Sequence, residues 1–209
     1  MLYALLFGMA FNFLSEEGRR LPGVELTSRS VLRIGVALLG VRITLDQVMA
    51  LGLWPVLMVV GAVVSTILVG WGLARMMGLG RDHGLLSGGA VAICGASAAM
   101  ALSLVLPRDD KSEQRTIVTV VGVTTLSTLA MILYPVVVSF LSMDNFTAGI
   151  FLGGTIHDVA QVVGAGFMIS TETGDVSTLI KLMRVAMLVP VVFLFSILFS
   201  YGVSEKGST

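Results

Sequence analysis

The sequence has little charge and a single cysteine. Only 12% of its 209 residues are charged, about half of the 25% that is typical of a soluble domain, and a soluble fold of this size could not cover its surface with so few. Thirteen basic residues balance thirteen acidic ones, which argues against a nucleic-acid partner. The single cysteine, Cys94, excludes an internal disulfide and a cysteine-based zinc site.

Signatures of catalysis are also missing. The sequence contains no P-loop, no HExxH, no GxSxG and no dinucleotide fingerprint, and its two histidines are too few for a metal triad. We therefore predict no enzymatic activity, no metal site and no cofactor. The first residues have no basic region and no A-x-A site, so they do not predict a cleavable signal peptide.

Long apolar runs dominate what is present. Hydrophobic residues make up 56% of the chain and the mean hydropathy is +0.96. A helix needs about 20 residues to cross a bilayer, and five runs are long enough: Val48–Ala74, Gly84–Pro107, Thr116–Leu141, Phe146–Ser170 and Leu179–Tyr201. Two shorter runs are Leu2–Leu14 and Val31–Val41. The sequence predicts an all-α polytopic membrane protein with about six or seven hydrophobic helices.

Charged residues fall in short segments between these runs. We therefore predict a single transmembrane domain over residues 1–209, with a polar connection at 15–30 and a polar tail at 202–209. Lys181 and Arg184 stand near the start of the last predicted span, where we expect them at the membrane interface.

Two of the predicted spans are rich in small residues. The first contains GGAVAICGASAAMALS and the second GGTIHDVAQVVGAG, and each opens on a glycine pair, which suggests an internal repeat. Small residues at helical spacing allow close helix packing. Alternatively, each span is a broken helix whose free N–H and C=O groups bind ions at mid-membrane. In the first span such a break would fall at Cys94, Gly95 and Ser97; the two interpretations are compatible.

The second span carries polar residues inside its apolar run. Thr155, His157, Asp158 and Gln161 lie within seven residues, and in a continuous helix the last three would share one face. An Asp at the bilayer centre costs about 2.5–3.5 kcal/mol, so it must face a partner or a cavity. A structural alternative is a bundle-locking hydrogen bond. If the helix breaks at its glycine pair, a half-helix would start at Thr155 and Asp158 could cap it.

Four strings carry a family resemblance: RIGVALLGVRITLDQVMALG, AICGASAAMA, GGTIHDVAQVVGAG and KLMRVAMLVPVV. Over nearly the whole chain the sequence resembles the YeiH-type family of bacterial inner-membrane sulfate exporters. That family is similar in plan to transporters built from inverted repeats with crossed, broken helices. The resemblance implies breaks around Cys94–Ser97 and Thr155–Gln161.

The chain departs from that family in length. Family members are longer and have further hydrophobic segments at both ends, including a C-terminal segment that resembles Leu32–Gly52. The chain is therefore expected to be truncated, with part of an inverted-repeat fold missing.

These observations predict a multi-pass secondary transporter of the bacterial inner membrane that moves a small anion, sulfate or a related oxyanion, by alternating access. Its partners are the lipid bilayer, the anion and a coupling proton or sodium ion; the sequence leaves open whether it forms a homo-oligomer. The predicted binding residues are Cys94, Gly95, Ser97, Thr155, His157, Asp158 and Gln161. His157 suits proton coupling because unperturbed histidine titrates near physiological pH. A channel or a structural membrane subunit is the alternative, and an intramembrane enzyme is less favoured.

Overall fold

The computed structural model describes residues 52–107 and 109–204. The chain divides into two compact units, Met1–Val48 and Met49–Thr209, and the described residues belong to the second. The predicted runs Leu2–Leu14 and Val31–Val41 and the polar connection at 15–30 lie outside the described residues. The last helix continues to Ser204, and the remainder of the predicted tail also lies outside them.

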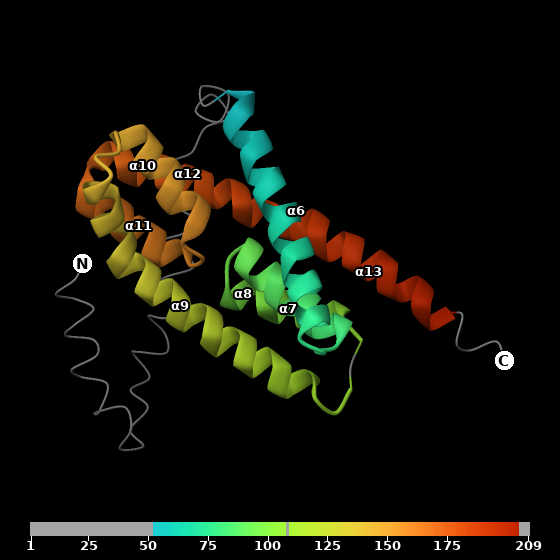
Figure 1. Ribbon diagram of the computed structural model, residues 1–209. Helices are drawn as coiled ribbons and strands as arrows, with labels where there is room; N and C mark the ends of the chain where they lie inside the picture. Colours follow the sequence, from blue (N-terminus) through green and yellow to red (C-terminus); the bar gives the residue numbers. More distant parts are fainter. Residues whose placement is uncertain (1–51, 108, 205–209) are drawn as a thin grey trace, which may run out of the picture. The chain divides into compact units, whose positions relative to one another are not determined.

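The described residues are helical and contain no strand (Figure 1). Three continuous helical stretches are long and apolar enough to cross a membrane: Leu53–Met76, Ser112–Phe140 and Thr171–Phe199. This confirms the predicted all-α polytopic membrane fold. The helices are α6 (Leu53–Met76), α7 (Arg81–Ala92), α8 (Ala96–Val105), α9 (Ser112–Phe140), α10 (Asn145–Thr155), α11 (Val159–Ile169), α12 (Thr171–Ala186) and α13 (Leu188–Ser204).

Both glycine-rich spans are broken helices, as predicted. The span Gly84–Pro107 contains α7 and α8, which are separated by three non-helical residues at 93–95. The span Phe146–Ser170 contains α10 and α11, which are separated at 156–158. Each half-helix has 10 to 12 residues, too few to cross a bilayer alone. The inner ends of the half-helices therefore lie within the span.

Helix α12 differs from the prediction because it begins at Thr171 rather than Leu179. The Ser170 side chain caps it by accepting a hydrogen bond from the Thr173 N–H. The first turns are polar, but their small side chains are buried where α12 packs against α10 and α11. Lys181 and Arg184 consequently lie well beyond the first turn of α12, and they are buried, with exposed fractions of 0% and 4%. Their predicted place at the membrane interface is wrong.

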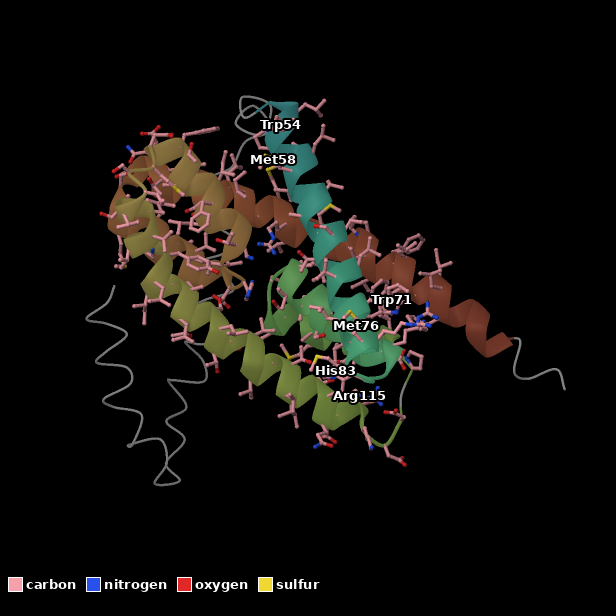
Figure 2. All side chains as sticks on the ribbon, in the orientation of Figure 1. Trp54, Met58, Trp71, Met76, His83 and Arg115 are labelled. Carbon is pink, nitrogen blue, oxygen red and sulfur yellow. The ribbon has the colours of Figure 1, made fainter. Side chains whose placement is uncertain are left out.

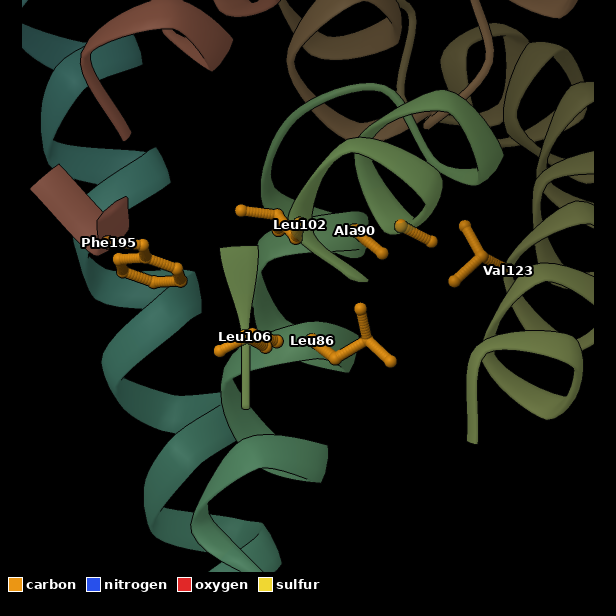
Figure 3. Close-up of a cluster of buried hydrophobic side chains, with 7 residues drawn as sticks. Leu86, Ala90, Leu102, Leu106, Val123 and Phe195 are labelled. Atoms are coloured by element: carbon orange, nitrogen blue, oxygen red, sulfur yellow. The ribbon is translucent and has the colours of Figure 1, made fainter. Parts of the chain in front are cut away.

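The half-helices α7 and α8 form a small apolar core with α9 and α13. Figure 3 shows its members, which are Leu86, Ala90, Ala99, Leu102, Leu106, Val123 and Phe195. Helix α6 packs against α7 and exposes much of its remaining surface. Leu53 and Trp54 are each 72% exposed, and Figure 2 shows Trp54 near the start of this helix. Such a continuous apolar surface is unfavourable in water and suits contact with lipid chains or further helices.

Candidate functional site

The two breaks meet next to helix α9. Gly95, in the first break, has φ +68°, a left-handed conformation that glycine adopts without steric cost. A Cβ atom at Gly95 would lie 3.1 Å from Cγ1 of Val123 on α9 and 3.6 Å from Cβ of His157 in the second break. We call this meeting point of the two breaks the crossing.

Lys181 joins the two breaks from helix α12. Its Nζ donates to the carbonyl oxygens of Ile93 and Ile156, each at 2.8 Å. Ile93 is the C-cap of α7 and Ile156 is the C-cap of α10. One side chain therefore satisfies the last carbonyl of both half-helices.

Arg184 makes a second bridge one turn further along α12. Its guanidinium donates to the carbonyl oxygens of Val91 and Ala92 on α7 and of Gly154 on α10. Helix ends leave such carbonyls unpaired, and an unpaired carbonyl in a membrane interior is costly. Together Lys181 and Arg184 provide hydrogen-bond donors for the carbonyls at the C-termini of both α7 and α10. Their spacing of three residues in the apolar second half of α12 was the sequence signal for a shared role.

Asp158 caps helix α11. Its carboxylate accepts hydrogen bonds from the backbone N–H groups of Ala160, at 2.8 Å, and Gln161, at 3.3 Å. Its own N–H donates to Ser127 Oγ on α9, at 3.1 Å. The expected cap is confirmed, but its position was predicted wrongly. Thr155 ends α10 instead of starting a half-helix, and its hydroxyl donates to the Phe151 carbonyl.

The non-helical segment at 156–158 also rearranges the predicted polar face. His157 and Asp158 are not on a continuous helix with Gln161, so the single helical face predicted for them is wrong. Gln161 Nε2 instead donates to the Thr128 hydroxyl on α9, at 3.0 Å. His157 Nδ1 and Gln161 Oε1 are buried and have no hydrogen-bond partner among the described residues. One polar atom in the second break and one on α11 are therefore buried without a partner in this part of the chain.

The first break leaves the start of α8 uncapped. No side chain caps this helix. Ala99 is the first of its residues whose N–H donates to a backbone carbonyl, that of Gly95. The N–H groups of Ala96, Ser97 and Ala98 have no backbone acceptor among the described residues. Ser97 Oγ lies 3.1 Å from Cys94 Sγ, and Ser97 is exposed. Free N–H groups at a helix start attract anions.

The charges around the crossing do not balance. Lys181 and Arg184 are buried cations, while Asp158 is engaged with the N–H groups of α11. Within the described ranges no carboxylate forms an ion pair with either cation. Nor do the described residues include a cluster of side chains suited to hold a metal ion. The local excess of positive charge favours a negatively charged ligand.

A surface hollow of about 430 Å³ lies elsewhere, between the α6–α7 turn and the start of α9. Its lining includes His83, Lys111 and Arg115, and Arg115 is paired with Asp109. Figure 2 shows His83 and Arg115 together at this end of the helices. None of the predicted binding residues lines it, so it is separate from the crossing.

Comparison with known proteins finds one family and relatives that are all named as membrane proteins. A family model described as "Conserved hypothetical protein 698" matches residues 1–209. A UPF0324 membrane protein of Chlorobaculum tepidum is 62% identical over 209 residues, which are 100% of this chain and 58% of that protein. The UPF0324 membrane protein TauZ of Paracoccus denitrificans is 56% identical over 198 residues, 94% of this chain and 59% of that protein.

A UPF0324 membrane protein of Rhizobium meliloti is 56% identical over 209 residues, 100% of this chain and 60% of that protein. The chain thus spans about three-fifths of the length of these curated relatives. No solved structure matches it significantly.

Proposed function

This chain belongs to the family of conserved hypothetical protein 698, and we propose that it is a secondary transporter of small anions. The proposed substrate is sulfate or a related oxyanion, and the proposed location is the bacterial inner membrane. The proposed substrate class rests on the charge of the crossing, because these relatives are named only as membrane proteins.

One observation carries the proposal. Lys181 and Arg184 are buried at the crossing without a carboxylate partner in the described part of the chain, and both donate to the carbonyl ends of the half-helices. The cations therefore neutralise the negative ends of α7 and α10, and Asp158 caps the positive end of α11, while the positive end of α8 has no side-chain cap. Broken helices bind anionic substrates with such N-termini.

The predicted binding residues take separate roles in this proposal. The first N–H groups of α8, which follow Gly95 and include that of Ser97, would donate to the oxyanion. His157, whose Nδ1 is unpaired among the described residues, would add a donor when protonated and would carry the coupling proton. Cys94 would line the site, as a small residue in the first break.

The residues of the second break would hold the other side. Gln161 would orient the site through its bond to Thr128, with its side-chain oxygen free to accept from a protonated substrate. Asp158 would fix the start of α11; a cation bound at this carboxylate is the other coupling scheme. Thr155 would close the end of α10. Rocking of the half-helices against α9 would then expose the crossing to alternate sides of the membrane.

Uptake of labelled sulfate into proteoliposomes containing the purified chain tests this proposal. We expect saturable uptake driven by an inward anion or proton gradient. Asp158→Asn preserves a helix cap but removes a charge from the site, and His157→Ala removes the proposed donor. We expect each variant to change uptake by about tenfold, equivalent to about 1.4 kcal/mol.

Matched controls are available in the same chain. Asp144 caps α10 outside the crossing, and His83 lies in the separate surface hollow, so Asp144→Asn and His83→Ala should retain wild-type uptake. Uptake that is unchanged in Asp158→Asn and His157→Ala would show that the proposed site is wrong. Ohmic conductance instead of saturable uptake would favour the channel alternative, and no flux would favour the structural subunit.

A further inference from the structure

The carbonyl ends of two half-helices converge on one amine. Ile93 and Ile156 belong to segments far apart in the sequence, yet their carbonyl oxygens lie at the same distance from Lys181 Nζ. Each helix C-terminus carries about half of a negative elementary charge. Two such ends at one point form a strong site for a cation.

In broken-helix transporters, carbonyl groups at these ends coordinate the coupling Na⁺ or H⁺. Here the position between the two carbonyls is filled by a side chain of the chain itself. Lys181 has an exposed fraction of 0% and is the bulkiest fully buried side chain among the described residues. A dissolved cation cannot occupy the same oxygen atoms while Lys181 holds them.

Arg184 does not duplicate this role. Its flat guanidinium bonds to the carbonyls of Val91, Ala92 and Gly154, which precede the C-caps. Such a fork fixes several acceptors in a plane, whereas an ammonium group is a compact point charge. Of the two, Lys181 therefore occupies the position that a small inorganic or ammonium cation could fill.

We propose that Lys181 is a built-in cation that replaces a dissolved coupling cation at the crossing. The inference rests on the proposed anion transport for its functional part, and it narrows that proposal. Binding and movement of the anion then need no Na⁺ at these carbonyls. Of the two coupling schemes above, the inference therefore selects the proton at His157 over a cation at Asp158.

Chemical rescue tests the proposal without requiring transport. Lys181→Ala leaves a space lined by the Ile93 and Ile156 carbonyls, which ammonium or methylammonium can enter. Lys181→Met fills the same space with an apolar side chain of similar length, so it leaves no room for ammonium or methylammonium. Thermal unfolding of the purified chain in detergent is measured with increasing ammonium, methylammonium or Na⁺, with choline chloride as the ionic-strength control.

We expect the unfolding midpoint of Lys181→Ala to fall below that of the wild type and to rise with ammonium or methylammonium. The wild type and Lys181→Met should not respond beyond the choline control. Equal responses in all three proteins, or no response of a folded Lys181→Ala, would overturn the proposal. This measurement reads cation binding alone, so its failure is distinct from a failure of the proposed anion transport.

Anion uptake provides the functional half of the test. Wild-type uptake should be the same in Na⁺ and in choline buffers, and Lys181→Ala should lose about tenfold, as expected for loss of a buried charged donor. Ammonium should restore uptake in Lys181→Ala but not in Lys181→Met. A wild type that requires Na⁺, or a Lys181→Ala variant with full uptake in choline, would overturn the built-in cation while leaving anion transport in place.

Discussion

Single residues determine how the ends of the helices are satisfied in this protein. Lys181 and Arg184 complete the carbonyl ends of α7 and α10, and Asp158 completes the N-terminus of α11. Burying a charge in a membrane is costly unless it is paired or hydrogen-bonded. These three residues meet that condition through hydrogen bonds to backbone groups.

Asp144 provides a residue-scale test of capping. The Thr147 N–H donates to its carboxylate, at 3.0 Å, and this bond holds the pKa of Asp144 below its ordinary value. The cap therefore contributes stability that is fully present above the unfolded pKa, about 3.9, and is lost as the pH falls through the lower folded pKa. Asp144→Asn retains a cap that does not titrate.

We expect the wild type to unfold at a higher temperature than Asp144→Asn near neutral pH, and the gap to shrink as the pH is lowered to about 3. Every other acidic residue titrates alike in the two proteins, so its effect cancels in the comparison. Thermal unfolding in detergent across this pH range measures the gap. A gap that stays constant with pH would contradict the account of the cap.

At the scale of elements, the sequence predicted the broken helices but not their ends. Cys94 and Gly95 lie in the first break as expected, but Ser97 lies in the first turn of α8. The second break lies beyond the glycine pair, because Gly153 serves packing: a Cβ atom there would lie 2.9 Å from Ile180 Cβ on α12. Glycine in a sequence is equally compatible with a turn and with a close helix contact. Which of the two it serves depends on the neighbouring helix, which the sequence does not identify.

Helix α12 could not be delimited from hydropathy. Residues 171–178 are polar and read as a connection, yet Thr173, Ser177 and Thr178 are buried against neighbouring helices. A start at Leu179 would have put Lys181 at the first turn; the actual start at Thr171 puts it in the helix interior. The two cations were therefore visible in the sequence, but their partners depend on three elements that only the fold brings together.

The contact between α6 and α7 gives a prediction for elements. A Cβ atom at Gly70 would lie 2.6 Å from the Gly88 Cα, and one at Gly72 would meet nothing within 4 Å. Gly70→Ala should therefore push the two helices apart and cost about 1–3 kcal/mol, the usual range for overpacking. Gly72→Ala, on the same helix, should be neutral or slightly stabilising.

The unfolding midpoints of the two variants in detergent measure this difference. We expect only Gly70→Ala to fall below the wild type. Equal midpoints for Gly70→Ala and Gly72→Ala would mean that the close approach of α6 and α7 does not contribute to stability.

For the whole molecule, composition alone predicted the environment. Scarce charge and long apolar runs predicted a helical membrane protein, and the structure and the relatives confirm this. The chain spans about three-fifths of those relatives, so transport by the whole protein remains our proposal. Its central claim is that an anion binds at the crossing and that the crossing opens to solvent.

The native cysteine allows a direct measurement of that claim. Cys94 is the single cysteine of the sequence, it lies in the first break, and its exposed fraction is 5%. Its rate of modification by a water-soluble maleimide is measured in liposomes with sulfate and with chloride at equal ionic strength. We predict slow modification in chloride and slower modification, in a saturable manner, in sulfate. A rate that does not depend on sulfate at any concentration would contradict anion binding at the crossing.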